Sequence, residues 1–555
     1  MAKAKVNSWR GWFRGPNEIL EPRMEYSLAL IFSAATLLGA FFDRGYSFAH
    51  MTGLQLLGWI AGSLALTELV RRLLRLLCRG LGKWTKMESN QREQIQEQGF
   101  LRGSFVRCFL FSLGVLLLCW LPVWLAYYPG FWNYDPWQAD QVITGVYSKH
   151  HPMLHTLLLG NCYRFALEKG HPQWAPLLYS AIQGGICALI YACCCAFLRQ
   201  RTRSNVFYWL TLLFFALFPV HPILAMSTTK DTLFSALILL SGLIFLRMME
   251  VNPPRRKWLM LAEVAVIALV VMLRNNARYG LTLLILLCLF QIKKKTGRRM
   301  LAALLAGTLL GMGADWGLGK VLHASPALLA EMCSVPSQMA GRVQEEVSNL
   351  DAETVALLDD FYSMNEISYD PHLADPMKAC LRLETREDLV RYLQGSFRLF
   401  TKYPAISIDS LLYTTEGLWN IRDISHTQIY GTGDRQGYMM TDIKSWYPMR
   451  LESKFPALEA FLEKILTENA FLKIPLLRSI FAPASYVYLL LLVIGILLQG
   501  MHRKWLLLPL FLLCLVGTIA LGPGILPRYV YPLMVCAPLL IWMAMKSIRR
   551  PVPEK

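Results

Sequence analysis

The sequence is poor in charge for its length. Charged residues make up only 17% of its 555 residues, while 55% of the residues are hydrophobic. An ordinary soluble chain has about 25% charged residues. Long runs of Leu, Val, Ile, Phe and Ala recur along most of the chain, and a soluble fold could not bury them all. The composition therefore predicts an all-α polytopic membrane protein.

Several familiar signals are absent. The 13 cysteines form no CxxC pair and no Cys/His metal spacing, and most of them lie inside apolar runs. No cleavage motif follows the first apolar run, so we expect a membrane span there rather than a signal peptide. No internal repeat of fixed period is visible. Cys333 and Cys380 lie in the one large polar segment, and the sequence alone does not say whether they pair.

The net charge is +18, yet its distribution does not indicate nucleic-acid binding. The Lys and Arg residues form short clusters between apolar runs, as the positive-inside rule predicts. No basic stripe with interleaved aromatic residues is present. We therefore expect membrane lipids, and no nucleic acid, among the partners of the chain.

Twelve apolar segments approach the length of a membrane span, about 20 residues. The predicted cytoplasmic segments 1–25 and 71–104 carry five and eight Lys or Arg residues, whereas the predicted external loops 43–50 and 220–231 carry one each. This asymmetry predicts a multi-pass protein of the plasma membrane with both termini in the cytoplasm. The predicted spans are 26–42, 51–70, 105–126, 174–198, 206–220, 232–249, 258–273, 279–292, 300–318, 483–500, 505–522 and 529–546.

The loops between the spans predict how the chain is organised. The basic segment 71–100 is predicted to form an amphipathic helix on anionic lipid. The first large external loop, 127–173, contains residues 152–168, which are predicted to form an amphipathic helix along the membrane surface. We expect four parts: 1–104, an N-terminal hairpin and basic cytoplasmic segment; 105–318, the transmembrane core; 319–482, a mostly helical extracytoplasmic domain; and 483–555, the last spans.

Polar residues gather in the loops predicted to be external. In YYPGFWNYDPWQADQ, Asp135 and Asp140 follow the third span among aromatic residues. A carboxylate there can act as a general base, bind a divalent cation or simply face solvent. HHPMLHT follows, with His150, His151 and His155. His151 and His155 could share a helix face, but HHPxxxH is no strong metal signature, so we favour contact with a substrate phosphate or sugar.

Two further loops contain basic residues between apolar spans. In STTKDTLFS, Lys230 and Asp231 begin a helix whose N–H groups and dipole favour a phosphate, or which is merely a capped helix end. LRNNARYG brings Arg274, Asn275 and Arg278 into one short turn, and a guanidinium group matches the geometry of a phosphate.

PRYVYP places Arg528 and Tyr529 at the external end of the last span. Each of these signals is weak alone, because snorkelling or solvated side chains would explain it. All of them fall on one predicted side of the membrane, whereas the cytoplasmic loops contain simple basic runs. This pattern predicts a site at the external membrane face that binds the phosphate of a lipid.

These motifs, in this order, resemble the GT-C superfamily of polytopic glycosyltransferases, nearest to an uncharacterised bacterial branch of it. The resemblance implies transfer of a hexose or pentose from a polyprenyl-phosphate donor to an extracytoplasmic glycan, lipid or protein acceptor. The acidic motif of that superfamily is often a pair, whereas here Pro136 follows Asp135. The matching segments are YPGFWNYDPWQADQ, HHPMLHT, STTKDTLFS, LRNNARYG, SVPSQMAGRV, YDPHLADPMK and PRYVYP.

The resemblance also implies roles for particular residues. Asp135, with Asp140 second, would be the catalytic base or substrate anchor, and segment 319–482 would help to bind the acceptor. It implies no certain cofactor and leaves a divalent cation, Mg²⁺ or Mn²⁺, open. The donor phosphate would contact Lys230, Arg274, Arg278 and Arg528.

Two other functions stay open at this stage. Twelve spans with both termini inside also suit a transporter or flippase of a lipid-linked sugar. Against it, the two halves show no repeat, and the ionisable residues lie at one face rather than in mid-membrane. A non-catalytic assembly or sensor protein could use the external domain as a binding module, but this would leave the polar loops unexplained.

Overall fold

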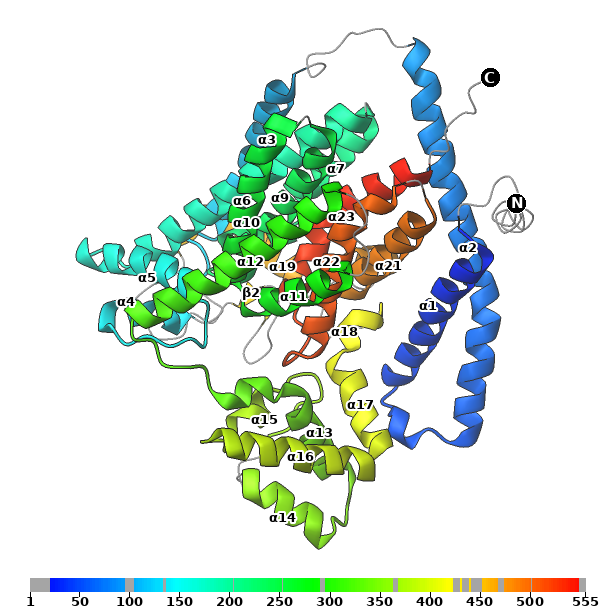
Figure 1. Ribbon diagram of the computed structural model, residues 1–555, viewed down its shortest axis with the longest axis vertical. Coiled ribbons are helices and arrows are strands. Elements are labelled where there is room, and N and C mark those ends of the chain that lie inside the picture. Colours follow the sequence, from blue (N-terminus) through cyan, green and yellow to red (C-terminus); the bar gives the residue numbers. More distant parts are fainter. Residues whose placement is uncertain are drawn as a thin grey trace.

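The computed structural model (Figure 1) consists almost wholly of helices. Among the residues it describes, the strands are β1 (Tyr430–Gly431) and β2 (Met439–Met440), which pair in parallel. This confirms the predicted all-α class. The described residues are 20–94, 104–132, 136–202, 204–251, 253–289, 295–362, 368–422, 430–431, 439–440, 452–467, 474–500 and 502–548.

Long apolar helices form a bundle, and each of the twelve predicted spans overlaps one of them. In the described part of the chain, eight helices are long and apolar enough to cross a membrane. A ninth span results if α7 and α8, which meet at a 45° bend, are counted together. The chain is therefore a multi-pass membrane protein. The bundle helices are α1 (Pro22–Phe42), α2 (Gly53–Gln94), α3 (Phe105–Ala126), α6 (Trp174–Thr202), α7 (Asn205–Leu217), α8 (Val220–Met226), α9 (Lys230–Glu250), α10 (Pro253–Leu273), α11 (Asn275–Leu289), α12 (Lys295–Val321), α21 (Pro483–Gln499), α22 (Leu507–Ala520) and α23 (Pro527–Ile548).

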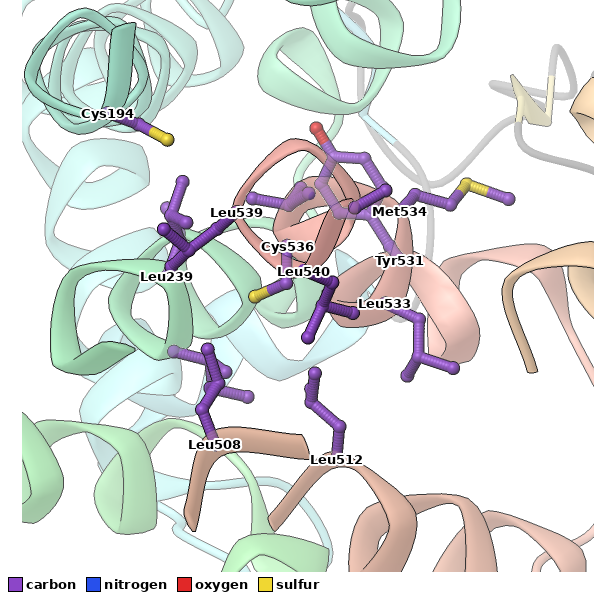
Figure 2. Packing of buried hydrophobic residues seen from close by; sticks show 14 of the residues in the cluster. Cys194, Leu239, Leu508, Leu512, Tyr531, Leu533, Met534, Cys536, Leu539 and Leu540 are labelled. Atoms are coloured by element: carbon purple, nitrogen blue, oxygen red, sulfur yellow. The ribbon is translucent and has the colours of Figure 1, made fainter. Parts of the chain in front are cut away.

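The last helix, α23, lies at the centre of this bundle. In the most apolar stretch of α23, 83% of the residues are buried, whereas in that of α2 only 17% are buried. Protein therefore surrounds α23, and α2 is peripheral. The side chains of α23 pack closely against α21 and α9, and also contact α6 and α22, which excludes water from the bundle interior. Figure 2 shows Tyr531, Leu533, Met534, Cys536, Leu539 and Leu540 of α23 with Cys194 of α6, Leu239 of α9, and Leu508 and Leu512 of α22.

The basic segment after the second predicted span differs from expectation. We predicted a separate amphipathic helix on the lipid surface over 71–100, but α2 continues without a break from Gly53 to Gln94. Neither Gly nor Pro interrupts residues 83–94, and the segment is rich in Lys, Arg, Glu and Gln, which are good helix formers. The charged segment therefore prolongs the second apolar helix, as Figure 1 shows.

A smaller helical body lies below the bundle in Figure 1. It has its own hydrophobic core, in which Cys333, Leu358, Met377 and Tyr392 are buried. Thr385 and Asp388 form a capping box that starts its longest helix. The elements are a 3₁₀ helix, η3 (Leu329–Met332), with α13 (Ser334–Glu346), α14 (Ala352–Phe361), α15 (Asp375–Ala379), α16 (Arg386–Lys402), α17 (Pro404–Thr414) and α18 (Glu416–Trp419).

The later part of segment 319–482 lies against the bundle. The amide of Lys454 donates to the carbonyl of Leu125 at the end of α3, and α19 (Pro456–Thr467) packs on the same helix. The short α20 (Pro475–Phe481) leads directly into α21. The described core of the smaller body is thus formed by residues between Ala330 and Ile406.

The structure answers the question left open for the two cysteines of this body. Cys333 and Cys380 are both free thiols. Burial raises the pKa of the Cys333 thiol to about 11, so it stays protonated near neutral pH. Cys333 is therefore a core residue rather than a reactive thiolate.

A buried ion pair joins the smaller body to the loop between α1 and α2. Asp409 of α17 is fully buried and accepts hydrogen bonds from the amides of Phe48 (2.6 Å) and Ala49 (3.4 Å), in the 3₁₀ helix η1 (Phe48–His50). Its other oxygen lies 2.8 Å from Arg342 of α13. The predicted external loop 43–50 is therefore held on the smaller body, as that topology requires.

We expect Asp409→Asn to loosen this attachment. Removing one partner of a buried ion pair costs about 3 to 5 kcal/mol. Because Arg342 also contacts Glu345 and Glu346, the loss should fall toward the low end. Thermal melting should shift down, and amides of residues 43–50 should exchange faster with deuterium. Asp359→Asn, on an exposed position of α14, is the control. Equal melting of both variants would contradict this role of Asp409.

Candidate functional site

Three charged side chains from three helices meet at the end of the bundle that faces the smaller body. Asp231 begins α9, Arg274 directly follows α10, and Arg528 begins α23. Arg274 forms an ion pair with Asp231, and Nε of Arg528 lies 3.5 Å from the second carboxylate oxygen of Asp231. The three side chains are 1%, 8% and 7% exposed, respectively. We call these three residues the Asp231 cluster.

Local sequence explains why Asp231 points into this cluster. Thr229 caps α9, accepting from the Asp231 amide and donating to its carboxylate. Two backbone hydrogen bonds join the segment before α9 to the first large loop. The amide of Thr228 donates to the carbonyl of Phe131, and the amide of Phe131 donates to the carbonyl of Met226. The N-terminal turn of a helix also favours an acidic side chain. The helix cap thus holds the carboxylate in addition to its contacts with the arginines.

An aromatic ring holds the two guanidinium groups. Tyr529 has its ring centre 4.5 Å from the Arg274 guanidinium carbon and 5.3 Å from that of Arg528. Phe234 lies 5.5 Å from Arg274 on another side. Cation–π contacts of this kind are stronger in a desolvated place than at the surface. The planes of the two guanidinium groups are therefore held by packing as well as by Asp231.

A fourth charge lies next to the cluster. Lys230 directly precedes Asp231, and its Nζ donates to Nδ1 of His151 at 3.0 Å. His151 is 4% exposed. Lys230, Arg274 and Arg528 thus bring three cationic groups to this end of the bundle. Guanidinium and ammonium groups of this kind are common partners of phosphate.

The HHP motif connects this place to the smaller body. His151 contacts Lys230, while Nδ1 of the neighbouring His150 lies 3.8 Å from Glu331 in η3. Glu331 in turn pairs with Lys378 of α15 at 2.7 Å. Burial would lower the pKa of Lys378, but Asp375 and Glu331 outweigh burial and raise this pKa. Two adjacent histidines thus contact the bundle on one side and the smaller body on the other.

The smaller body also covers the loop that leads to Arg528. The amide of Ala374 donates to the carbonyl of Pro523 at 2.6 Å. A Cβ atom at Gly524 would lie 2.6 Å from the carbonyl oxygen of His372, so this close approach requires glycine. The motif YDPHLADPMK is therefore part of the surroundings of the Asp231 cluster.

The structure brings some of the predicted site residues together and separates others. Lys230, Asp231, Arg274, Arg528 and Tyr529 come together, although three loops far apart in the sequence carry them. Asp231 was expected to contact substrate, but it is buried between arginines. It therefore holds other groups in place.

Two predicted residues of the LRNNARYG turn do not join the cluster. Arg278 points elsewhere: its Nη2 donates to the hydroxyl of Tyr279 at 3.2 Å. Asn275 begins α11 and is half-buried. Among the described residues neither side chain contacts Asp231. Arg274 precedes α11 whereas Arg278 lies within it, so helical spacing does not bring their side chains together.

The structure describes only one of the two acidic residues predicted in the first large loop. Asp135 lies outside the described residues. Asp140 begins the short helix α4 (Asp140–Thr144), which follows the 3₁₀ helix η2 (Pro136–Ala139). In the described part of the chain, no hydrogen bond or ion pair links the Asp140 carboxylate to the Asp231 cluster.

The expectation that His151 and His155 share a helix face is wrong, because His151 precedes α5 (Met153–Glu168) and only His155 lies in it. His155 is buried and its Nε2 lies 2.8 Å from the hydroxyl of Tyr179. The described residues contain no group of three or more His, Cys, Asp or Glu side chains that could hold a metal ion.

A buried polar network beneath the cluster was not predicted. Tyr179 donates to Gln183, and the amide of Gln183 donates to the carbonyl of Ser227 at 2.7 Å. Gln138 accepts from Thr156 at 3.2 Å. Tyr179 and Gln183 lie four residues apart on α6, but their contacts with other segments are not apparent from the sequence. They position the segment that caps α9.

Fold and site together define an all-helical multi-pass membrane protein with a cationic, largely buried site at one end of its bundle. The chain belongs to a family of unknown function, DUF6020, whose model matches residues 142–555. The match includes the whole Asp231 cluster and the smaller body, and begins after Asp135 and Asp140. No curated protein and no solved structure matches the chain.

We expect Asp231→Asn to destabilise the protein by about 3 to 5 kcal/mol, because it removes the ion-pair partner of the buried Arg274 guanidinium group. Adding Arg274→Gln should recover part of this loss, since that charge is then removed as well. Unfolding in detergent measures both effects. Glu250→Gln, at the exposed opposite end of α9, should cost at most about 1 kcal/mol. Strictly additive effects of the two cluster variants would contradict the coupling.

Proposed function

We propose that this protein is a glycosyltransferase that moves a sugar from a polyprenyl-phosphate donor to an extracytoplasmic acceptor. The observation that carries the proposal is the gathering of three cationic side chains, Lys230, Arg274 and Arg528, where the bundle meets the smaller body. A lipid-linked phosphate has its charge at the membrane edge and its chain among apolar helices, which suits this position. The resemblance to GT-C enzymes points to the same substrate class.

The reaction follows from the charges. The acceptor hydroxyl attacks the anomeric carbon, the bond from that carbon to the phosphate oxygen breaks, and polyprenyl phosphate leaves. The cationic groups stabilise the negative charge that grows on the phosphate. Asp135, assigned by the resemblance alone, would take the proton of the hydroxyl, with Asp140 as second candidate. No step in this scheme runs through Mg²⁺ or Mn²⁺.

Acceptor binding belongs on the side of the smaller body in this proposal. The loop around His372 and Ala374 packs on the segment that leads to Arg528. An acceptor held there would approach the donor phosphate from outside the bundle. The candidate acceptors are a cell-envelope glycan, a lipid or a protein.

We also propose that twelve helices cross the plasma membrane with both termini in the cytoplasm. Basic residues concentrate in the segments that this topology leaves inside. The described contacts agree with it: the amide of Glu21, before α1, donates to Gln499 at the end of α21. Gly500 packs against Ser547, near the end of α23. These helix ends lie together, opposite the smaller body (Figure 1).

A transporter or flippase of a lipid-linked sugar is the second candidate. The observation that favours it is the 45° bend between α7 and α8, because discontinuous helices line the substrate sites of many transporters. The bend falls at Phe218–Pro219, where proline disfavours a continuous helix. Binding of a donor without turnover would support this candidate.

We expect Arg274→Lys and Arg528→Lys to reduce donor turnover roughly 100- to 1,000-fold, the loss seen when a group that stabilises transition-state charge is removed. The full chain in lipid nanodiscs is incubated with a panel of polyprenyl-phosphate sugars, and free polyprenyl phosphate is followed by mass spectrometry. Arg247→Lys, at the opposite end of α9, is the matched control. Wild-type rates in both cluster variants would rule out the proposed role.

Asp135→Ala and Asp135→Asn should each abolish transfer in the same assay while donor binding stays near wild type. The reason is that either change removes the base but leaves the cationic groups in place. Asp140→Asn tests the second candidate in parallel. If both Asp135 variants retain near-wild-type rates and Asp140→Asn does not, the base is Asp140.

A further inference from the structure

One acidic side chain lies deep inside the bundle, away from the Asp231 cluster. Glu263 is 4% exposed and sits halfway along α10, a helix of 21 residues. Ser241 of α9 donates a hydrogen bond of 2.6 Å to one of its carboxyl oxygens. The other oxygen is buried and has no hydrogen-bond partner among the described residues.

The surroundings of Glu263 provide no compensating charge. The helices α9 and α12 pack on α10, and in α12 the Cβ of a side chain at Gly307 would lie 2.8 Å from the carbonyl oxygen of Val264. Within the described residues Glu263 forms no ion pair with the charged side chains of the elements around α10. These are Lys230, Asp231, Arg247 and Glu250 of α9, Arg298, Arg299, Asp315 and Lys320 of α12, Arg164 and Glu168 of α5, and Arg278 of α11.

A carboxylate in such a place is costly. Burying an ionised carboxyl group without a counter-charge is so unfavourable that the group takes up a proton instead. A single hydroxyl donor does not offset that cost. The packing seen here is therefore the packing of a neutral carboxylic acid, and ionisable groups inside a membrane bundle commonly mark functional positions.

Glu263 also connects the two helices that form the Asp231 cluster. Ser241 lies ten residues into the bundle from Asp231 on α9, which corresponds to about 15 Å along a helix. Arg274, which directly follows α10, lies eleven residues after Glu263 in the sequence. The helices are thus joined twice, by Ser241 and Glu263 in the middle and by Asp231 and Arg274 at the end.

We propose that Glu263 is a proton-binding site in the middle of the bundle, occupied while α9 and α10 are packed as seen, and that release of its proton separates these helices and displaces Arg274 from Asp231. The proton leaves the carboxyl oxygen for water and returns by the same route, so no other reactant is needed. This inference does not depend on the reaction assigned above.

The direct test is infrared spectroscopy of the full chain in lipid nanodiscs from pH 5 to pH 9. A protonated carboxylic acid has a C=O stretching band separate from the amide bands. We expect wild type to show such a band at neutral pH, Glu263→Gln to lack it, and Ser241→Ala to shift it, because the hydrogen bond to the carbonyl oxygen is lost. Asp315→Asn, a half-buried acid on α12, is the matched control and should leave the band unchanged. A neutral-pH spectrum of wild type identical to that of Glu263→Gln would overturn the proposal.

The second test asks whether the proton controls the end of the bundle. Deuterium exchange of residues 228–234 and 273–278 is compared between wild type and Glu263→Gln at equal pH, which cancels the chemical pH dependence of exchange. We expect equal protection at pH 6 and several-fold faster exchange of wild type at high pH, once the infrared band has disappeared. Equal exchange after loss of the band would overturn the coupling, whether or not the protein transfers sugar.

Discussion

The end of the bundle depends on one buried carboxylate. Asp231 neutralises Arg274 and shares its second oxygen with Arg528, in a place from which water is nearly excluded. Without it, the desolvated guanidinium group of Arg274 would lose its ion pair, which proteins do not tolerate without a large loss of stability. The positions of α9, α10 and α23 at this end therefore depend on each other through a single acid.

An aromatic ring also holds the arginines at this end. The guanidinium carbons of Arg274 and Arg528 lie 4.5 Å and 5.3 Å from the ring centre of Tyr529. A site preorganised in this way loses little entropy when an anion binds. The contacts of His150 and Gly524 hold the smaller body next to this end of the bundle.

Much of this architecture could be predicted from sequence, for a physical reason. Spans are encoded locally, because about 20 apolar residues are enough, and each of the twelve predicted segments overlaps a helix. The basic residues Lys230, Arg274 and Arg528 stand out because charge is rare between apolar runs. The direction in which each side chain points could not be predicted. Arg278 closely follows Arg274 in the sequence and yet contacts Tyr279, and His155 turned into the core rather than toward His151.

The buried polar groups explain the remaining differences. Tyr179 and Gln183 share a face of α6, but Gln183 also donates to the carbonyl of Ser227, and Glu263 of α10 accepts from Ser241 of α9. No spacing rule joins residues across such distances, so their networks become visible only in three dimensions. Glu263 weakens one argument from the sequence, which held that ionisable residues lie at one face of the membrane. One acid lies midway, between the helices that hold the site.

The central claim is that the cationic end of the bundle binds the phosphate of a polyprenyl lipid. Native mass spectrometry of the full chain with polyprenyl phosphate measures this binding directly, without requiring the sugar or the acceptor to be known. The account predicts one bound lipid for wild type and for Arg247→Gln, and its loss in Arg274→Gln and Arg528→Gln. Equal occupancy in all four proteins would contradict the claim, because the lipid would then bind elsewhere.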